Sequence, residues 1–378
     1  MVDAEFLTSL VAFPPASSIG FITPPASFAD AIECWQLSHG RHALPWQNTS
    51  DPYRVWLSEI MLQQTQVATV IGYYSRFLER FPTVGELAAA GEDAVLGLWS
   101  GLGYYSRARN LHRCAQDVVA LHGGQFPRTA ALLQTLPGIG RSTAAAIASF
   151  CFGERVAILD GNVKRVLTRV LGFSADLAKA ANEHALWEKA TELLPSRNVL
   201  QSMPRYTQGV MDLGATICTG RQPKCLLCPV QKICRASADG NAEKYPVKTR
   251  TLKRSKQALS LLLAQRFDGA CWLEKRPVPG VWGGLFCLPV FGSDEALKVF
   301  LPSALHRKLQ SLPPFIHVLT HKDLHLSPWH ARLLPTQAIR SVEEATISSG
   351  AWFLPSEWDS AGLPAPIRRL LVQYASDG

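Results

Sequence analysis

Hydrophobic positions follow two different spacings along the chain, and the first of them is helical. From Phe28 to about Leu213 apolar residues recur every three or four positions, and strand-like alternation is sparse. Asp51 and Pro52 supply a cap and a first-turn proline for a helix that should run to about Tyr73. Further helices are delimited by Pro82, Pro127 and Asp160. This part of the chain is predicted to be all-α.

The spacing becomes strand-like after about Ser255. Leu259–Gln265 and Gly283–Pro289 are predicted strands bounded by glycine and proline turns, and a helix is expected over Asp294–Phe300. This second part is therefore predicted to be α+β. Residues 1–27 show little periodicity and carry the sequence Pro-Pro-Ala-Ser twice, so they are expected to form a flexible or loosely attached extension.

Positive charge is concentrated between the two parts. The chain has a net charge of +8, and residues 221–256 contain ten basic and two acidic side chains, which accounts for all of it. Such a segment is typical of a protein that binds a polyanion, and a solvated linker is the alternative. No basic signal sequence and no apolar run long enough for a bilayer is found, so a cytoplasmic protein without membrane contact is expected.

Nine cysteines in such a chain favour metal or thiol chemistry over disulfides. Four of them lie close together, with six, two and five residues between them: Cys218, Cys225, Cys228 and Cys234. Four thiolates in one short loop suit a zinc ion or a [4Fe–4S] cluster, and spacing alone separates these poorly. Arg221 and Lys224 lie in the same loop, which is thereby predicted to contact phosphate. The remaining cysteines stand among apolar residues and are expected in the core: Cys34, Cys114, Cys151, Cys271 and Cys287.

A glycine-containing turn leads into an alanine-rich helix. Residues 136–143 read Leu-Pro-Gly-Ile-Gly-Arg-Ser-Thr, and Gly138 and Gly140 would let backbone N–H groups at the helix start approach an anion. Two glycines alone are weak evidence, but the full motif resembles the helix-hairpin-helix with which repair proteins hold the DNA backbone. Gly138, Gly140 and Ser142 are therefore predicted to contact DNA.

The order of the motifs resembles that of one superfamily. The hairpin is followed by Asp160 about twenty residues later and then by the four cysteines, as in the endonuclease III superfamily of base-excision glycosylases. Within it the chain is most similar to the MutY-type adenine DNA glycosylases, over about residues 28–375. The stretches that carry the resemblance are Leu44–Trp46, Ser58–Thr65, Gly101–Tyr105, the hairpin, Leu159–Asn162 and the cysteine loop.

The resemblance implies chemical roles for two carboxyl groups. Glu59 would protonate a flipped adenine at N7 and then help to activate water, with a pKa raised by partial burial. Asp160 would stay ionised and stabilise the oxocarbenium ion, and Asn162 would orient the sugar or Asp160. Without the resemblance, Glu59 would be assigned to a helix surface and Asp160 to a helix cap. If one helix continues past Glu59, that residue shares a face with Gln63 and Gln66.

The same resemblance implies residues at the opened base pair, a cofactor and a reaction class. Tyr104 would be an aromatic wedge beside the damaged guanine and Gln64 a second residue there, although a buried tyrosine with a hydrogen-bonded hydroxyl is the alternative. The four cysteines would hold a [4Fe–4S] cluster, with no redox role implied. Ser142 stands where the endonuclease III branch carries a Schiff-base lysine, so the enzyme is predicted to be monofunctional.

Residues 256–375 resemble a MutT/Nudix-type domain, most clearly at Pro279–Leu285. A Nudix hydrolase needs a glutamate-rich helix for Mg²⁺, and no such pattern follows Gly283, so this domain is expected to recognise a lesion without hydrolysing nucleotides. The resemblance implies that it inspects 8-oxoguanine through Leu319, Thr320 and His321. Thr320 retains a hydroxyl at this site, whereas Leu319 replaces an aromatic residue.

The expected protein is therefore multidomain. Its predicted divisions are an extension (1–27), an all-α helix-hairpin-helix catalytic region (28–217), an iron–sulfur loop (218–234), a basic linker (235–256) and an α+β Nudix-like domain (257–378). The predicted activity is hydrolysis of the N-glycosidic bond of adenine opposite 8-oxoguanine or guanine in double-stranded DNA, by a monomer in the bacterial cytoplasm at the nucleoid. The alternatives are an endonuclease III-like pyrimidine glycosylase and lyase, and a catalytically silent DNA-binding homologue.

Overall fold

The computed structural model describes residues 27–249, 254–333 and 350–375. The expected extension over residues 1–27 therefore lies outside the described residues, apart from Ser27, which caps the first helix. Part of the basic linker, residues 250–253, also lies outside them. No helix in the described ranges is both long enough and apolar enough to cross a membrane.

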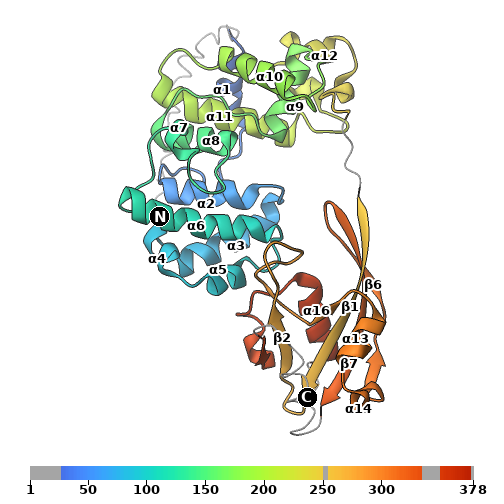
Figure 1. Ribbon diagram of the computed structural model, residues 1–378. Helices are drawn as coiled ribbons and strands as arrows, with labels where there is room; N and C mark the ends of the chain where they lie inside the picture. Colours follow the sequence, from blue (N-terminus) through green and yellow to red (C-terminus); the bar gives the residue numbers. More distant parts are fainter. Residues whose placement is uncertain (1–26, 250–253, 334–349, 376–378) are drawn as a thin grey trace, which may run out of the picture.

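The helical part forms two groups of helices (Figure 1). One group consists of α2 (Pro52–Leu62), α3 (Val67–Arg80), α4 (Val84–Ala89), α5 (Glu92–Trp99) and α6 (Tyr105–His122). The other consists of α1 (Phe28–His39), α9 (Gly161–Leu171), α10 (Ala180–Glu192), α11 (Val199–Thr216) and α12 (Arg235–Ala238). Between them lie α7 (Ala130–Leu133) and α8 (Arg141–Phe152). Residues 27–249 contain no strand, so the all-α prediction is confirmed for this stretch.

One helix belongs to the hydrophobic cores of both groups. Ala144 and Ile147 of α8 are buried in the core of the first group, which is built on Trp56 and neighbouring residues. Ala145 and Ala146 are buried in the core of the second group. Because small alanines alternate around α8, helices approach it closely on two sides, and α8 holds the two groups at a set separation.

The predicted helix from Pro52 to about Tyr73 is wrong in its length. It ends at Leu62, and α3 begins at Val67 after a turn in which Gln64 takes a positive φ of 57°. Gln63 is the C-cap of α2 and Gln66 the N-cap of α3. Glu59, Gln63 and Gln66 therefore do not share a helical face, and the turn separates the glutamines from the end of α2.

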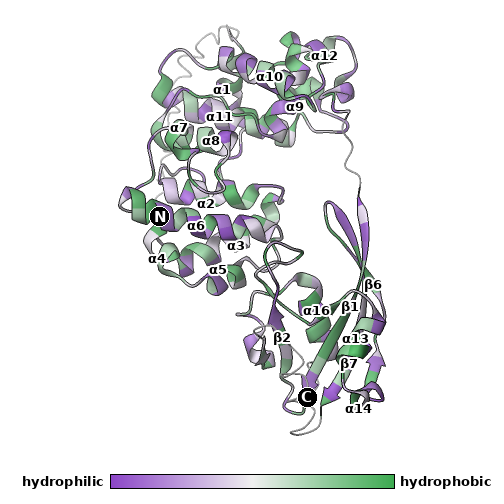
Figure 2. Ribbon diagram, in the orientation of Figure 1, coloured by the Kyte–Doolittle hydropathy of each residue, from purple (hydrophilic) through white to green (hydrophobic). Residues whose placement is uncertain are grey.

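The second part is α+β, as predicted, and is built on one mixed sheet. Within the described residues its strands are β1 (Ser255–Arg266), β2 (Cys271–Lys275), β3 (Phe286–Cys287), β4 (Val290–Phe291), β5 (Leu309–Ser311), β6 (Phe315–Val318), β7 (Lys322–Leu333) and β8 (Gly350–Phe353). β1 and β7 run parallel, and the remaining pairs are antiparallel. β1 is hydrophilic at its two ends and mainly hydrophobic between them (Figure 2), and its residues 259–265 are buried. The predicted strand over 283–289 is confined to Phe286–Cys287, since Trp282 and Gly284 have turn conformations with positive φ.

Helices complete the second part and join it to the first. α13 (Asp294–Phe300) matches its predicted range, and α14 (Ser303–His306) and α16 (Ala365–Tyr374) follow. Leu285 and Leu363 share a buried cluster with Leu96 of α5, so the two parts have a continuous core. A hydrogen bond also joins the two parts, since Ser100 Oγ donates to the Leu363 carbonyl at 2.7 Å.

Candidate active site

Glu59 lies one turn before the end of α2, next to the separation between the two helix groups. Its neighbours Ser58 and Ile60 are buried, and Glu59 itself is half-buried. Burial raises the pKa of Glu59 from an ordinary 4.5 to about 8, and the negative charge of Asp160 adds to the rise. The side chain is therefore protonated at neutral pH, which agrees with the raised pKa expected from the sequence.

Asp160 is the N-cap of α9, as its position before a helical segment predicted. Its Oδ1 accepts the Val163 amide hydrogen at 2.7 Å. Burial raises the pKa of Asp160, but the amides of Val163 and Asn162 and the cation of Arg165 counteract that rise. The capping role and a chemical role are compatible, because one oxygen caps the helix and the carboxyl group still lines a cleft.

The two carboxyl groups meet in one cleft between the helix groups. Glu59 and Asp160 line it together with Gln64, Ser142 and Asn162. The two carboxyl groups also interact electrostatically, because the negative charge of Asp160 raises the pKa of Glu59. Residues about one hundred positions apart in sequence are thus brought to opposite walls of one cleft.

Ser142 supports the wall that carries Asp160. Its Oγ accepts the amide hydrogen of Leu159 at 3.1 Å, so the hydroxyl anchors the extended segment that leads into α9. No amine is present at this position to attack a sugar, as the sequence indicated.

Asn162 is held in place from two directions. Its Oδ1 accepts from the Arg165 guanidinium at 2.8 Å, and Arg165 also donates to the carbonyls of Cys218 at 2.7 Å and Gly214 at 2.6 Å. Gly214 of α11 lies so close that a Cβ there would stand 2.7 Å from the Asn162 Cβ, which only glycine avoids. Arg165 thus links the cysteine loop to the start of α9.

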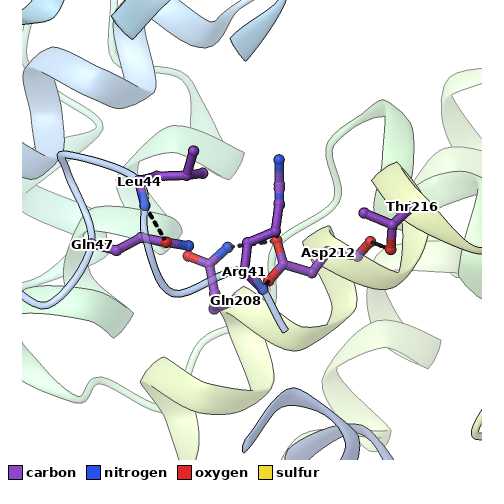
Figure 3. Close-up of polar contacts among 6 residues, drawn as sticks. All are labelled: Arg41, Leu44, Gln47, Gln208, Asp212 and Thr216. Atoms are coloured by element: carbon purple, nitrogen blue, oxygen red, sulfur yellow. Dashed lines mark hydrogen bonds and ion pairs between the residues drawn. The ribbon is translucent and has the colours of Figure 1, made fainter. Parts of the chain in front are cut away.

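A second pocket adjoins the cleft at Glu59, and its polar residues were missed by sequence reasoning (Figure 3). Two of its lining residues, Arg41 and Gln208, are held by Asp212 of α11, which is fully buried and does not itself line the pocket: Asp212 accepts from the Arg41 backbone at 2.9 Å, from the Arg41 side chain at 2.6 Å and from Gln208 at 2.9 Å. Gln47 Oε1 accepts from the Leu44 amide at 3.0 Å, while its buried Nε2 has no partner among the described residues. The available signal was Asp212 itself, the only acidic residue in the stretch 199–216.

The glycine turn has the geometry expected of a helix-hairpin-helix. Gly138 has a φ of 76°, and a Cβ there would stand 2.8 Å from the Asn110 Cβ, so a side chain would force the turn away from α6. Gly140 is the N-cap of α8, and no described side chain caps that helix. The first amides of α8 therefore keep free N–H groups at its positive end.

The residues predicted at the opened base pair lie together beside the cleft. Gln64, Tyr104 and Gly138 line one further pocket. Tyr104 has a φ of 50° as the N-cap of α6, and its ring is 41% exposed, so it is not a buried core tyrosine. Its hydroxyl is hydrogen-bonded to Thr320 Oγ1, in the exposed turn between β6 and β7 that also carries His321.

The cysteine loop forms a small cavity lined by Cys218, Cys225, Cys228 and Cys234. Arg169 of α9 is 1% exposed and donates to Cys218 Sγ at 3.3 Å and to the Thr219 carbonyl at 2.6 Å. In the described ranges no group of three or more His, Cys, Asp or Glu side chains is arranged to hold a single metal ion. Arg221 and Lys224 are exposed on this loop.

The other cysteines follow their predicted burial only in part. Cys114, Cys271 and Cys287 are buried and Cys151 is half-buried, but Cys34 is exposed, so its assignment to the core is wrong. Cys34 follows Ile32 and precedes Trp35 on α1, and both of those face the core, which leaves Cys34 on the solvent side of the helix.

Two family models agree with this architecture. A family model described as HhH-GPD superfamily base excision DNA repair protein matches residues 57–192, and a NUDIX domain model matches residues 260–373. A solved thermostable thymine-DNA glycosylase is 29% identical, with a TM-score of 0.49, over 56% of this chain and 95% of its own.

Two relatives with similar sequences are both named adenine DNA glycosylase. The adenine DNA glycosylase of Homo sapiens is 47% identical over 220 residues, which cover 56% of this chain and 39% of the relative. The adenine DNA glycosylase of Buchnera aphidicola subsp. Acyrthosiphon pisum is 36% identical over 352 residues, which cover 92% of this chain and 97% of the relative. Because that alignment spans nearly all of both chains, this chain belongs to the adenine DNA glycosylase family of base-excision-repair enzymes.

Proposed function

We propose that this protein releases adenine from DNA by a monofunctional hydrolysis in which Glu59 is the acid and Asp160 the anion. Glu59 protonates adenine at N7, the bond between N9 and C1′ of the sugar breaks, and the bonding electrons leave with the base. Asp160 stabilises the positive charge on the sugar. Water then attacks C1′ and gives its proton to Glu59, leaving free adenine and an abasic site. The observation that carries this proposal is the single cleft lined by both Glu59, whose pKa is raised by burial and by the charge of Asp160, and Asp160, which caps α9.

The extruded base is proposed to enter the pocket that adjoins Glu59. Arg41, Gln47 and Gln208 supply polar groups there, and Trp46 and Val55 supply apolar lining. The unpaired Gln47 Nε2 suits a ring nitrogen acceptor of a purine. Because Glu59 lines both this pocket and the cleft, a base in the pocket presents its glycosidic bond toward Asp160.

The opposite base is proposed to be 8-oxoguanine, with guanine as a poorer partner. Support comes from the contact between Tyr104 and Thr320, which joins the wedge position of the helical part to the turn of the second part. An aromatic ring inserted beside an opened pair offsets the loss of stacking. Thr320 and His321 would then face the lesion, while Gln64 occupies the space of the missing base.

Phosphate contacts are proposed for two elements. The uncapped start of α8, with Gly138, Gly140 and Ser142, offers backbone N–H groups without reading sequence. Arg221 and Lys224 offer exposed charge on the cysteine loop. Both elements would act on double-stranded DNA, in a monomer at the bacterial nucleoid.

The four cysteines are proposed to hold a [4Fe–4S] cluster. Their side chains line one common cavity, and four thiolates from one short loop are a ligand set that such a cluster takes. When bound, the cluster would brace the loop and exchange no electrons in the reaction. Arg165 and Arg169 transmit that bracing to α9.

The experiment that tests the function compares duplexes containing A opposite 8-oxoguanine, A opposite G and T opposite G under single-turnover conditions. We expect release of adenine from the first two, fastest with 8-oxoguanine, and none from the third. Borohydride should trap no covalent complex, whereas efficient trapping would indicate the lyase alternative. Iron analysis should give about four atoms per chain if the cluster is a cube, and zinc in its place would contradict that assignment.

A further inference from the structure

Arg107 of α6 is a buried cation with four side-chain hydrogen bonds near the cleft, and neither the sequence motifs nor the proposed chemistry assigns it a role. Its side chain is 8% exposed overall. Nη1 donates to the carbonyls of Ile60 at 3.0 Å and Met61 at 2.9 Å, and also to that of Gln63. Nη2 donates to Thr65 Oγ1 at 3.1 Å.

These acceptors lie at the end of α2 and in the turn that follows it. The last carbonyls of a helix have no intrahelical donor and carry the negative end of its dipole, so a cation there is stabilising. The planar fork of arginine reaches several acceptors at once, which an ammonium group cannot do equally well. Burial lowers the pKa of Arg107 to about 10, so it stays charged at neutral pH.

Arg107 also contacts the residue predicted to insert into DNA. Its guanidinium carbon lies 5.5 Å from the centre of the Tyr104 ring and 5.2 Å from that of Trp99. Its backbone N–H donates to the Tyr104 carbonyl at 2.7 Å, which closes the first turn of α6 around the positive φ of Tyr104. Arg107, Gln64 and Tyr104 line the same pocket.

We propose that Arg107 is a positioning residue that couples insertion at the base pair to the placement of the acid. One guanidinium holds the Gln63–Thr65 turn and supports the Tyr104 ring, and Glu59 directly precedes the first carbonyl that it binds. DNA that pushes on Tyr104 or Gln64 therefore acts on the end of α2. This inference rests on the proposed function, since it assumes that Glu59 acts on a base extruded beside Tyr104.

The test compares Arg107→Met with Arg107→Lys, and uses Arg113→Met as the matched control, because Arg113 is exposed on the same helix. Three quantities are measured for each: the single-turnover rate on A opposite 8-oxoguanine, the Kd for that duplex, and the fluorescence of a 2-aminopurine placed next to the target adenine, which reports unstacking. Melting temperatures and iron content identify variants that are merely unfolded.

We expect Arg107→Met to lower the single-turnover rate by about 10- to 100-fold, the loss typical of a small misplacement of reacting groups. Its Kd should change little, its 2-aminopurine signal should fall, and Arg107→Lys should recover part of both rate and signal. Arg113→Met should match the wild type. A folded Arg107→Met that keeps the wild-type rate and signal would overturn the proposal. So would a rate loss that follows only the folded fraction, with no recovery in Arg107→Lys. Failure of the wild type to release adenine would instead refute the proposed function.

Discussion

The two walls of the cleft each present one carboxyl group, but they are built differently. The wall of Glu59 is the end of α2, and its core continues through Leu96 into the second part of the molecule. The wall of Asp160 is the beginning of α9, and its core is continuous with the cysteine loop. One carboxyl group thus lies near a negative helix end and the other at a positive one.

This difference gives the two carboxyl groups different electrostatic environments. Glu59 is desolvated and has the charge of Asp160 near it, so its pKa rises to about 8 and it keeps its proton. Asp160 is also desolvated, but two backbone amides and Arg165 favour its ionised form. In the proposed mechanism, these environments suit Glu59 to act as the acid and Asp160 as the stabilising anion.

The largest effects are expected when the carboxyl group of each wall is replaced in turn by an amide. Glu59→Gln removes the proton donor and should reduce single-turnover adenine release by about 10²- to 10⁴-fold, the range for loss of a general acid. Asp160→Asn should cost about 10²-fold or more through lost charge stabilisation, while asparagine still caps α9. Both variants should bind the duplex. Unimpaired release by Glu59→Gln would remove its proposed role.

The pH dependence of the single-turnover rate tests whether Glu59 and Asp160 interact as proposed. A raised pKa keeps Glu59 in its acid form at neutrality, so the single-turnover rate should fall about tenfold per pH unit only above about pH 8. At low pH the rate should fall as Asp160 becomes protonated. In Asp160→Asn the basic limb of the residual activity should move to lower pH, because a charge that raises the Glu59 pKa is gone. A basic limb that does not move would show that the two groups are not coupled.

The sequence predicted those parts of the site that depend on short stretches of chain. Asp160 could be placed because capping is local, and the glycine turn because Gly138 needs a positive φ. The break after Leu62 could not be seen, since the turn contains neither glycine nor proline and is held by Arg107, more than forty residues away. Partners distant in sequence leave no local periodicity.

The polar network at the pocket beside Glu59 was missed for the same reason. Asp212 and Arg41 are 171 positions apart, and neither stands in a motif that was recognised. Asp212 alone gave a usable signal, because a carboxylate on the buried face of α11 demands a partner. The contact of Tyr104 with Thr320 depends on how two domains meet, which no periodicity describes.

A smaller effect, on stability, is expected from the hydrogen bond of Ser142 that supports the Asp160 wall. Ser142→Ala leaves the Leu159 amide without its acceptor, which should lower the free energy of unfolding by about 1–3 kcal/mol. Denaturant titration measures this loss, and Ser142→Thr, which keeps the hydroxyl, is the control. Equal stability of Ser142→Ala and the wild type would show that the Asp160 wall does not depend on this hydrogen bond.

The smallest effect concerns the link between the Glu59 wall and the second part of the molecule. Thr320→Ala removes the hydroxyl that contacts Tyr104, and an exposed hydrogen bond of this kind is worth about 0.5–1.5 kcal/mol. The rate on A opposite 8-oxoguanine should therefore fall by about two- to tenfold, while the rate on A opposite G stays unchanged. Thr320→Ser should behave as the wild type does. An equal loss on both duplexes would mean that the Thr320 contact positions Tyr104 for every substrate, and that discrimination between guanine and its oxidised form does not depend on Thr320.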